Sequence, residues 1–520
     1  MRLLLIAVIL FCSNLGKANS NISLLGSFAY NQEISDVWGY TDEFGNEYAL
    51  VGAQKGFSIV DVTTPSNPVE VFYQSGYKST WRDIKVYNDH AYITNETNGG
   101  LLIVDMSPLP QNTTLQVDSF FGTTHMFSRA HNIWIDENGV AYIFGANNGK
   151  GGAIMFDLTQ NPKVPVEIGF IDNFYLHDGF VRGDTLWGSA VYEGLQIIMD
   201  VSDKVNPQIL TTFETPGTFS HNCWPSDNGK YVFTTDEIAG GYIGSFDVSD
   251  FSDPKEVDKF RIASLKNPIP HNTFVLDNLL ITSYYSEGLH ILDATYPQSL
   301  IEVGKYDSSP LFEDDFHGAW GVYPYFDSGK ILIADIEEGL FIFQPNIQTP
   351  AYLQGEVRDT ITNNPIINCE VVVFGSRTFK TQEFGNYYTG AKNSGLYSVR
   401  FQKQGYISKT INNIQLNQGS IKTLDTYLIP EGASLGNEEL GTKSEDFRIY
   451  PNPSSGTLYI KNAANIKRFQ VMNAFGQVLS TKEINNQDLV VFQIEAARGV
   501  YFVNITTKDG KSEIRKVIIR

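Results

Sequence analysis

Histidines at a nearly regular interval are the most chemically distinctive feature of this 520-residue chain. Five of them each begin an apolar, aromatic-rich run, and two aspartates continue the series toward the N-terminus. The separations are 47, 48, 46, 44, 50 and 46 residues for the series Asp36, Asp83, His131, His177, His221, His271 and His317. Imidazole and carboxylate ligands suit a divalent ion such as Zn, Fe, Mn, Cu or Ca. If the fold brings these residues together, they form a candidate metal site.

Charged residues at related positions could surround such a site. Acids occur after the second apolar run of several copies, at Glu96, Glu193, Glu237, Glu287 and either Glu337 or Glu338. Arg82 and Arg129 could reach the same region and attract an anionic ligand. Alternatively, each arginine could pair with an acid and brace the fold.

A purely structural role for the histidines is also open. In the repeated pattern His-Asn-x-Trp or Phe, each imidazole could bond the backbone of the neighbouring repeat and act as a latch. Inheritance of one repeat motif would explain several copies without any ligand. Catalysis by a side-chain nucleophile has no visible signature, because the chain has no G-x-S-x-G, Walker, H-E-x-x-H or C-x-x-C pattern.

The elements that must position these residues are short strands. A glycine, an apolar run and an aspartate recur seven times, starting at Gly56, Gly100, Gly152, Gly194, Gly241, Gly288 and, without the aspartate, Gly339. A period in the mid-forties that holds four short strands is typical of one β-propeller blade. We therefore predict an all-β fold: a seven-bladed β-propeller over residues 21–346, followed by two small β-sandwich domains. In a propeller the first strand of each blade lines the central channel, so the series above should converge at one channel mouth.

Two local features support this arrangement. The aspartate that ends the third strand of a copy precedes a turn rich in Ser, Thr, Asn and Pro, and it can accept hydrogen bonds from that turn. The seventh copy lacks a fourth strand, whereas residues 21–31 look like one. We expect this N-terminal strand to pair beside Gly339–Phe343 and close the ring, which removes exposed sheet edges.

The repeat residues resemble a known family. The pattern Gly-Leu-x-Ile-Val-Asp-Val-Ser is similar to the LVIVD repeat, and residues 21–346 resemble the secreted LVIVD-repeat proteins labelled choice-of-anchor B. The resemblance implies a β-propeller on a secreted or surface protein and implies no particular activity.

Two further segments resemble known domains. Residues 351–430 contain Gly355, Val357 and Asp359 and later Gly405-Tyr406, and they are similar to the carboxypeptidase regulatory-like domain. Residues 447–520 begin near Tyr450-Pro451-Asn452-Pro453 and resemble the C-terminal sorting domain of type IX secretion substrates. The second resemblance implies that the type IX machinery of a Bacteroidetes-like, Gram-negative cell recognises residues 447–520 and exports the chain. The acidic, Gly- and Ser-containing stretch 431–446 between them is predicted to be a linker.

The N-terminus and the composition agree with export. Residues 1–20 combine a basic Arg2, an apolar run and a small-residue end, which predicts a secretory signal peptide and no transmembrane segment in the mature chain. The formal net charge of −20 argues against nucleic acid as a partner.

We therefore expect a secreted or cell-surface binding protein for a protein, glycan or small-molecule ligand, with a metal at the channel mouth as one option. Two alternatives are a metal-assisted hydrolase or lyase acting at that mouth and a structural adhesion scaffold.

Overall fold

The computed structural model describes residues 19–262, 267–311, 315–431, 447–461, 463–473, 477–494, 497–510 and 512–520. The predicted signal peptide over 1–20 and the predicted linker over 431–446 lie almost wholly outside these residues. The chain divides into two compact units, one up to Pro430 and one from Glu431 onward. The described residues form strands, turns and two short 3-10 turns, so the predicted all-β class is confirmed.

Seven four-stranded antiparallel sheets occupy the first two-thirds of the chain. The first contains β2 (Ile34–Thr41), β3 (Glu47–Ala53), β4 (Gly56–Asp61) and β5 (Val69–Ser75). The second contains β6 (Ile84–Tyr87), β7 (His90–Ile93), β8 (Leu101–Asp105) and β9 (Gln116–Phe120). The third contains β10 (Asn132–Ile135), β11 (Val140–Phe144), β12 (Ala153–Asp157) and β13 (Val166–Ile171). The fourth contains β14 (Asp178–Arg182), β15 (Thr185–Ala190), β16 (Leu195–Asp200) and β17 (Gln208–Glu214).

The remaining three sheets continue the same order. The fifth contains β18 (Ser220–Pro225), β19 (Tyr231–Asp236), β20 (Ile243–Asp247) and β21 (Lys255–Phe260). The sixth contains β22 (Thr273–Leu276), β23 (Leu279–Ser283), β24 (Leu289–Asp293) and β25 (Ile301–Tyr306). The seventh combines β26 (Ala319–Tyr323), β27 (Ile331–Asp335) and β28 (Gly339–Pro345) with the N-terminal β1 (Ile22–Phe28).

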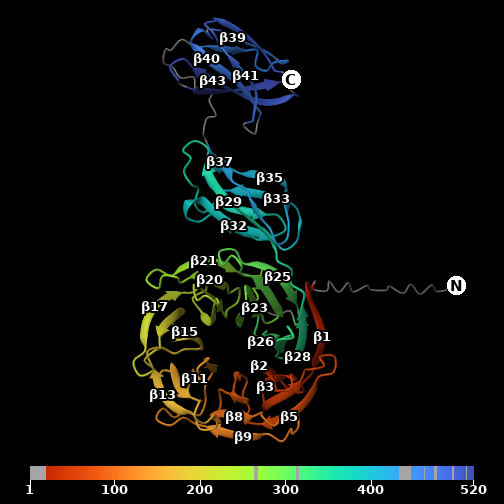
Figure 1. Cartoon of the computed structure of the whole chain (residues 1–520), viewed down its shortest axis with the longest axis vertical. Coiled ribbons are helices and arrows are strands. Elements are labelled where there is room, and N and C mark those ends of the chain that lie inside the picture. Colours follow the sequence, from red (N-terminus) through yellow and green to blue (C-terminus); the bar gives the residue numbers. More distant parts are fainter. Residues whose placement is uncertain are drawn as a thin grey trace, which may run out of the picture. The chain divides into compact units, whose positions relative to one another are not determined.

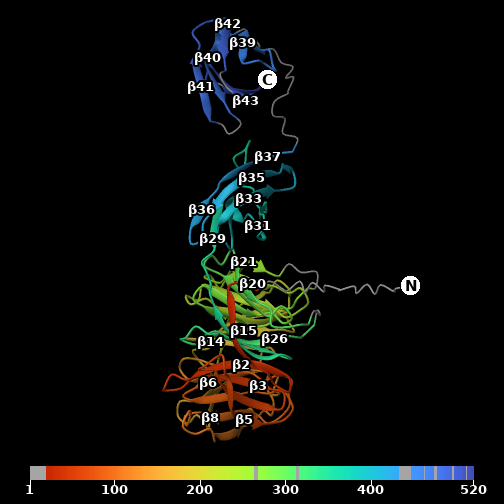
Figure 2. The same ribbon diagram turned by 90° about the vertical axis from the view of Figure 1, so that its right-hand side faces the viewer.

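The sheets form a ring, seen face-on in Figure 1 and from its edge in Figure 2. The first strand of each sheet is innermost, and β26 contacts β2. Strand β1 pairs antiparallel with β28, from Ile22 opposite Pro345 to Phe28 opposite Leu340, which is the position expected of a closing strand. Burial falls from the inner to the outer strands: every residue of β3 is buried, whereas β5 contains only exposed and half-buried residues. The core of this ring therefore lies between neighbouring sheets.

The aspartates that end the third strands hold the following turns, as predicted. The backbone N–H two residues later donates to each carboxylate at 2.8–3.2 Å, for Asp61, Asp105, Asp157, Asp200, Asp247 and Asp293. These six acids hold turns, and none of them belongs to a group of possible metal ligands among the described residues.

Two sheets follow the ring within the first unit. One contains β29 (Ala351–Asp359), β32 (Asn386–Ala391), β34 (Tyr406–Ile407), β36 (Ile421–Thr423) and β37 (Thr426–Pro430). The other contains β30 (Glu370–Val373), β31 (Thr378–Lys380), β33 (Gly395–Gln402) and β35 (Lys409–Leu416). They enclose a common hydrophobic core that includes Leu353, Val371 and Phe401.

The second unit also consists of two sheets. One contains β38 (Arg448–Tyr450), β39 (Thr457–Lys461) and β42 (Leu489–Gln493). The other contains β40 (Ile466–Met472), β41 (Val478–Glu483), β43 (Gly499–Thr507) and β44 (Ser512–Ile519). Residues such as Leu458, Phe469 and Val503 are buried between them.

Candidate metal centre

Four histidines lie side by side where the innermost strands of four consecutive sheets begin. His131, His177 and His271 stand just before β10, β14 and β22, and His221 is the second residue of β18. The pairing of β18 with β19 shifts between Ser220 and Asn222, so His221 is the extra residue of a β-bulge. The ring centroids of consecutive histidines are 3.8, 4.4 and 4.5 Å apart. The 44-to-50-residue repeat thus brings these four imidazoles into one cluster.

Asp178 is the carboxylate at the centre of this cluster. Its Oδ1 is 3.2 Å from Nδ1 of His177 and 3.8 Å from Nε2 of His131. Its Oδ2 accepts a hydrogen bond from the amide of Asn222 at 3.2 Å. One ligand atom from each of His131, His177, Asp178 and His221 can be chosen so that all four lie within 4.8 Å of one another.

Several nitrogens of the cluster have no hydrogen-bond partner. Nδ1 of His177, Nδ1 of His221 and Nε2 of His271 are buried and unsatisfied within the described structure. The contact of His177 with Asp178 is close but does not have hydrogen-bond geometry, so the two groups attract without a formal bond. Buried polar groups without a partner are costly, and they often indicate a water or ion that binds there.

The electrostatics divide the cluster into neutral and charged members. Burial, reinforced by the neighbouring imidazoles, holds the pKa of His177 below and that of His221 well below the usual value. Burial lowers the pKa of His271 to about 3. Although burial opposes ionisation of Asp178, the adjacent histidines hold its pKa below the usual range. Neutral imidazoles beside an ionised carboxylate are the protonation states that metal ligands require.

His131 differs because it has a second acidic partner. Burial opposes its protonation, but a 2.6 Å hydrogen bond between its Nδ1 and Glu96 outweighs this and raises the pKa of His131 to about 9. That bond fixes the ring so that Nε2 faces Asp178. The protonated His131 must release the proton on Nε2 before it can bind an ion. A carboxylate that holds the far nitrogen of an imidazole is then the usual support of a metal-binding histidine.

A second group of possible ligands shares His221. Its Nε2 is 3.4 Å from Glu237, and Nε2 of His271 is 3.6 Å from the same carboxylate. Burial raises the pKa of Glu237 to about 7, and Tyr285 donates a 2.5 Å hydrogen bond to it. A neutral imidazole has one free lone pair. Since His221 can serve only one ion, the group with three histidines and an ionised Asp178 is the stronger candidate.

His317 does not join the cluster. The pairing of β26 with β27 places Gly321 opposite Ala334 after a register shift, which corresponds to Asn222 opposite Thr235 in β18. Trp320, not His317, therefore occupies the place of His221. Its ring lies 4.3 Å from His271 and stacks on Trp81 at 5.4 Å. The expectation that His317 begins an inner strand at this position is therefore wrong. The sequence from His317 to Trp320 resembles the repeated His-Asn-x-Trp pattern, but His317 lies three residues before the position that aligns with His221.

His317 instead forms an ion pair outside the cluster. Its Nδ1 is 2.6 Å from Glu337, and about a third of its side chain is exposed.

Asp36 and Asp83 make bonds that join neighbouring sheets, and they belong to neither group of possible ligands among the described residues. Oδ2 of Asp36 accepts the backbone N–H of Ile84 in the next sheet at 3.1 Å. Asp83 pairs with Lys85 at 2.5 Å and bonds the amide of Asn132 in the next sheet. The expectation that the two aspartates replace histidines is thus wrong, since they align with the residue after each histidine.

The predicted bond between neighbouring sheets is therefore made mainly by the residue that follows each histidine position. Asn222 continues the series by accepting the N–H of Thr273 in the next sheet at 3.1 Å. Among the histidines, His271 also bonds the next sheet, through Nδ1 to the carbonyl of Trp320 at 2.6 Å. The bond between neighbouring sheets is thus confirmed for Asn222 and His271, and the role of the histidines as metal ligands stays a prediction.

The surrounding charged residues are only partly where they were expected. Glu96 and Glu237 contact the cluster, as described above. Glu193 is exposed and Glu287 half-buried, and neither belongs to a group of possible ligands among the described residues. Arg82 is buried and donates to the carbonyls of Ala53 and Tyr77, so it braces the backbone, and it forms no ion pair with an acid among the described residues. Arg129 is exposed.

The central carboxylate, Asp178, was missed from the sequence. The signal was present, because Asp178 is the only acid that directly follows one of the four clustered histidines. Cys223 lies two residues after His221, but its thiol donates to the carbonyl of Trp187 at 3.4 Å within the core, and burial raises its pKa to about 12.

Comparison with known families supports three parts of the sequence interpretation. Residues 45–74 and 80–111 match the LVIVD repeat, residues 352–428 match the carboxypeptidase regulatory-like domain, and residues 448–520 match the secretion system C-terminal sorting domain. No curated protein gives a significant match to the chain. Within the described residues, no helix has the length and apolar character of a membrane span. The sorting domain marks the chain for recognition by the type IX secretion system, so the protein is secreted or attached to the outer surface of a Bacteroidetes-like cell.

Proposed function

We propose that this exported protein binds one divalent transition-metal ion through His131, His177, Asp178 and His221. The observation that carries the proposal is the convergence of these four side chains, with their ligand atoms within 4.8 Å of one another and buried imidazole nitrogens that lack partners. Ligands of a tetrahedral zinc ion are roughly 3.3 Å apart, given metal–ligand distances of about 2.0–2.2 Å. The 3.2 and 3.8 Å contacts of Asp178 are close to that spacing. Small rotations of the imidazoles would complete the geometry.

The donor set favours a transition metal over calcium. Calcium binds six to eight oxygens, whereas three of the four donors here are imidazole nitrogens. Burial supports ion binding rather than catalysis on a large substrate, because the side chains of His221 and Asp178 are only 2% and 4% exposed. We therefore place ion binding ahead of the hydrolase or lyase alternative and of the adhesion scaffold.

Metal analysis of the purified full chain tests the proposal. The protein is equilibrated with Zn²⁺, dialysed, and analysed for metal by plasma mass spectrometry, together with His221→Ala and His125→Ala. His125 is a matched control, since it pairs with Glu167 at 2.6 Å outside the cluster. We expect about one ion per chain in the wild type and in the control, and a large loss in His221→Ala.

A second variant guards against misfolding. Asp178→Asn keeps the shape of the side chain and an oxygen for Asn222, but it removes the central negative charge. It should also lose the ion while it remains folded by circular dichroism. Wild-type protein without metal after loading, or folded variants that retain it, would refute the proposal.

A further inference from the structure

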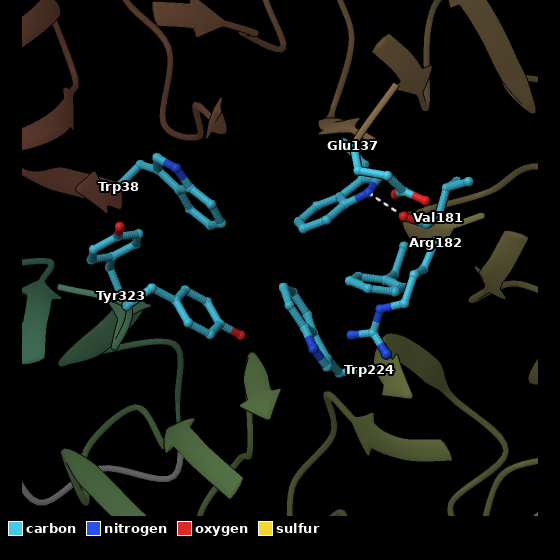
Figure 3. A pocket seen from close by; sticks show the side chains of 9 residues that line it. Trp38, Glu137, Val181, Arg182, Trp224 and Tyr323 are labelled. Carbon is cyan, nitrogen blue, oxygen red and sulfur yellow. Dashed lines mark hydrogen bonds between the residues drawn. The ribbon is translucent and has the colours of Figure 1, made fainter. Parts of the chain in front are cut away.

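The channel contains a second, chemically different hollow beyond the histidines. The innermost strands run away from the histidine cluster, so a residue three positions further along lies roughly 10 Å deeper. At that level aromatic side chains from several sheets surround a pocket of about 360 Å³. The aromatic lining residues are Trp38, Trp134, Phe180, Trp224, Tyr323 and Tyr325. Figure 3 shows Trp38, Trp224 and Tyr323 around a central space. The volume is in the range of sites for small organic ligands.

The aromatic walls meet at steep angles. The ring of Trp134 is nearly perpendicular to that of Trp38, at 82°, and to that of Trp224, at 86°. Hydrogen bonds hold two of the walls, from Nε1 of Trp134 to the carbonyl of Val181 at 2.7 Å and from Tyr325 to that of Val275 at 3.0 Å. The pocket is thus a preformed box with ring faces on several sides, not a slot for a flat aromatic ligand.

One residue of each charge also lines the pocket. Arg182 donates to the carbonyl of Ser226 at 3.0 Å and lies over the ring of Phe180 at 4.9 Å. The exposed Glu137 accepts the N–H of Gly183 at 2.6 Å. Each keeps further donor or acceptor capacity. Trp38, Trp224 and Tyr323 make no side-chain hydrogen bond with the described residues, which leaves their polar atoms for solvent or a ligand.

The rings and the charged groups of the pocket favour some classes of ligand over others. A cationic ligand is disfavoured because two of the rings already carry a cation: Lys85 lies 4.3 Å from the ring of Trp38, and Arg182 lies over Phe180. An anionic ligand would meet Glu137 and a chain of net charge −20. A purely apolar ligand would use neither Arg182 nor Glu137. A neutral ring with apolar C–H faces and hydroxyls at its edge satisfies both the aromatic walls and the two charged groups.

We propose that this pocket is a carbohydrate-binding site that takes a neutral pyranose unit. The C–H faces of the sugar pack on Trp38 and Trp224, while its hydroxyls accept from Arg182 and donate to Glu137. The site is separate from the histidine cluster and does not depend on the metal proposal.

Saturation-transfer difference NMR on the purified full chain tests the pocket. The probes are methyl glycosides of glucose, mannose, galactose and N-acetylglucosamine, compared with tetramethylammonium and with methyl glucuronide. We expect saturation transfer to the ring protons of at least one neutral glycoside. Trp224→Leu should raise its dissociation constant at least about tenfold. The matched control is Trp81→Phe, whose ring stacks on Trp320 outside the pocket and whose replacement should leave binding unchanged.

Trp224 is buried, so its replacement could disturb the fold, and Glu137→Gln on the exposed rim provides an independent test. It keeps an oxygen for Gly183 but removes the charge, and we expect several-fold weaker binding. The proposal is overturned if no neutral glycoside shows transfer, if only a charged probe does, or if both pocket variants bind the sugar like the wild type.

Discussion

His221 and Asn222 are neighbours on one strand but contribute to different properties. Asn222 bonds Asp178 in one adjacent sheet and Thr273 in the other. His221 makes no hydrogen bond through its buried Nδ1. At the residue scale, the motif therefore combines a sheet-to-sheet bond with a potential ligand.

Substitutions of Asn222 and His221 should therefore change different properties of the protein. Asn222→Ala should lower the free energy of unfolding by about 2–3 kcal/mol, because it leaves buried partners unsatisfied. His221→Ala should instead abolish the increase in melting temperature that Zn²⁺ causes in the wild type. Thermal unfolding of both variants with Zn²⁺ and with a chelator measures this. The assignment fails if Asn222→Ala is as stable as the wild type, or if His221→Ala keeps the full Zn²⁺ effect.

Asp335 predicts a pH dependence of stability. Its carboxylate is buried at the end of β27, accepts from Ser308 at 2.7 Å, and has its pKa raised by burial to about 6. Because the folded state holds the proton more tightly than the unfolded state, this stabilising contribution is present at low pH and lost as the pH rises through about 6.

Asp335→Asn should remove that loss. Between pH 5 and pH 8 the variant should lose about 1–2 kcal/mol less unfolding free energy than the wild type. Chemical denaturation at both pH values checks the difference. Identical changes for the two proteins would show that Asp335 does not titrate in this range.

The residue scale also shows what the sequence could supply. The period alone indicated that His131, His177, His221 and His271 cluster. It failed at His317, because only strand register reveals that Trp320 holds the seventh place. The sequence did not indicate Asp178 as a ligand because the corresponding position in the neighbouring copies is an asparagine, whose side chain bonds the adjacent sheet.

At the scale of elements, the closing strand depends on a glycine. A side chain on Gly26 of β1 would meet the carbonyl of Pro65 at 1.8 Å, in the turn after β4. A side chain on Gly169 of β13 would likewise meet the carbonyl of Lys204, in the turn after β16 of the following sheet, at 2.1 Å. The shared glycine explains why the N-terminal segment resembles the last strand of a repeat.

Gly26→Val should consequently weaken ring closure. The added side chain forces β1 away from the turn, and we expect a loss of at least about 2 kcal/mol in unfolding free energy. Ser27→Val is the matched control, since Ser27 is exposed on the same strand and valine favours strands. Equal melting temperatures for Gly26→Val and the wild type would contradict this role of β1.

Strands and turns were accessible to sequence reasoning because apolar runs, glycines and turn aspartates repeat with a fixed period. The β-bulges were not. The shift at His221 results from how two strands pair, and no residue type marks it. The aromatic pocket was missed for a related reason, since its members are ordinary core residues in the sequence and meet only when the ring closes.

At the scale of the whole molecule, the first sandwich contacts the ring within the same unit. Arg377 pairs with Asp258 of β21 at 2.5 Å and donates to the carbonyl of Leu300 at 3.2 Å. Tyr352 donates to Asp293 at 2.9 Å. These contacts indicate that the sandwich is a stabilising support of the ring.

Breaking the ion pair between Arg377 and Asp258 should remove part of the stabilisation that the sandwich gives to the ring. Arg377→Met leaves the buried Asp258 without its partner and should cost about 2 kcal/mol, whereas adding Asp258→Asn should recover part of that cost. Scanning calorimetry of the single and double variants measures the coupling. Strictly additive effects would argue against the pair.

The central claim is that the channel of this exported protein holds a transition-metal ion at its histidine cluster. X-ray absorption spectroscopy of the Zn²⁺-loaded full chain tests it most directly. We predict a four-coordinate ion with imidazole nitrogen as the main ligand, contributed by His131, His177 and His221, and one carboxylate oxygen from Asp178. A spectrum dominated by oxygen ligands without imidazole scattering, or one unchanged in Asp178→Asn and His221→Ala, would contradict the account.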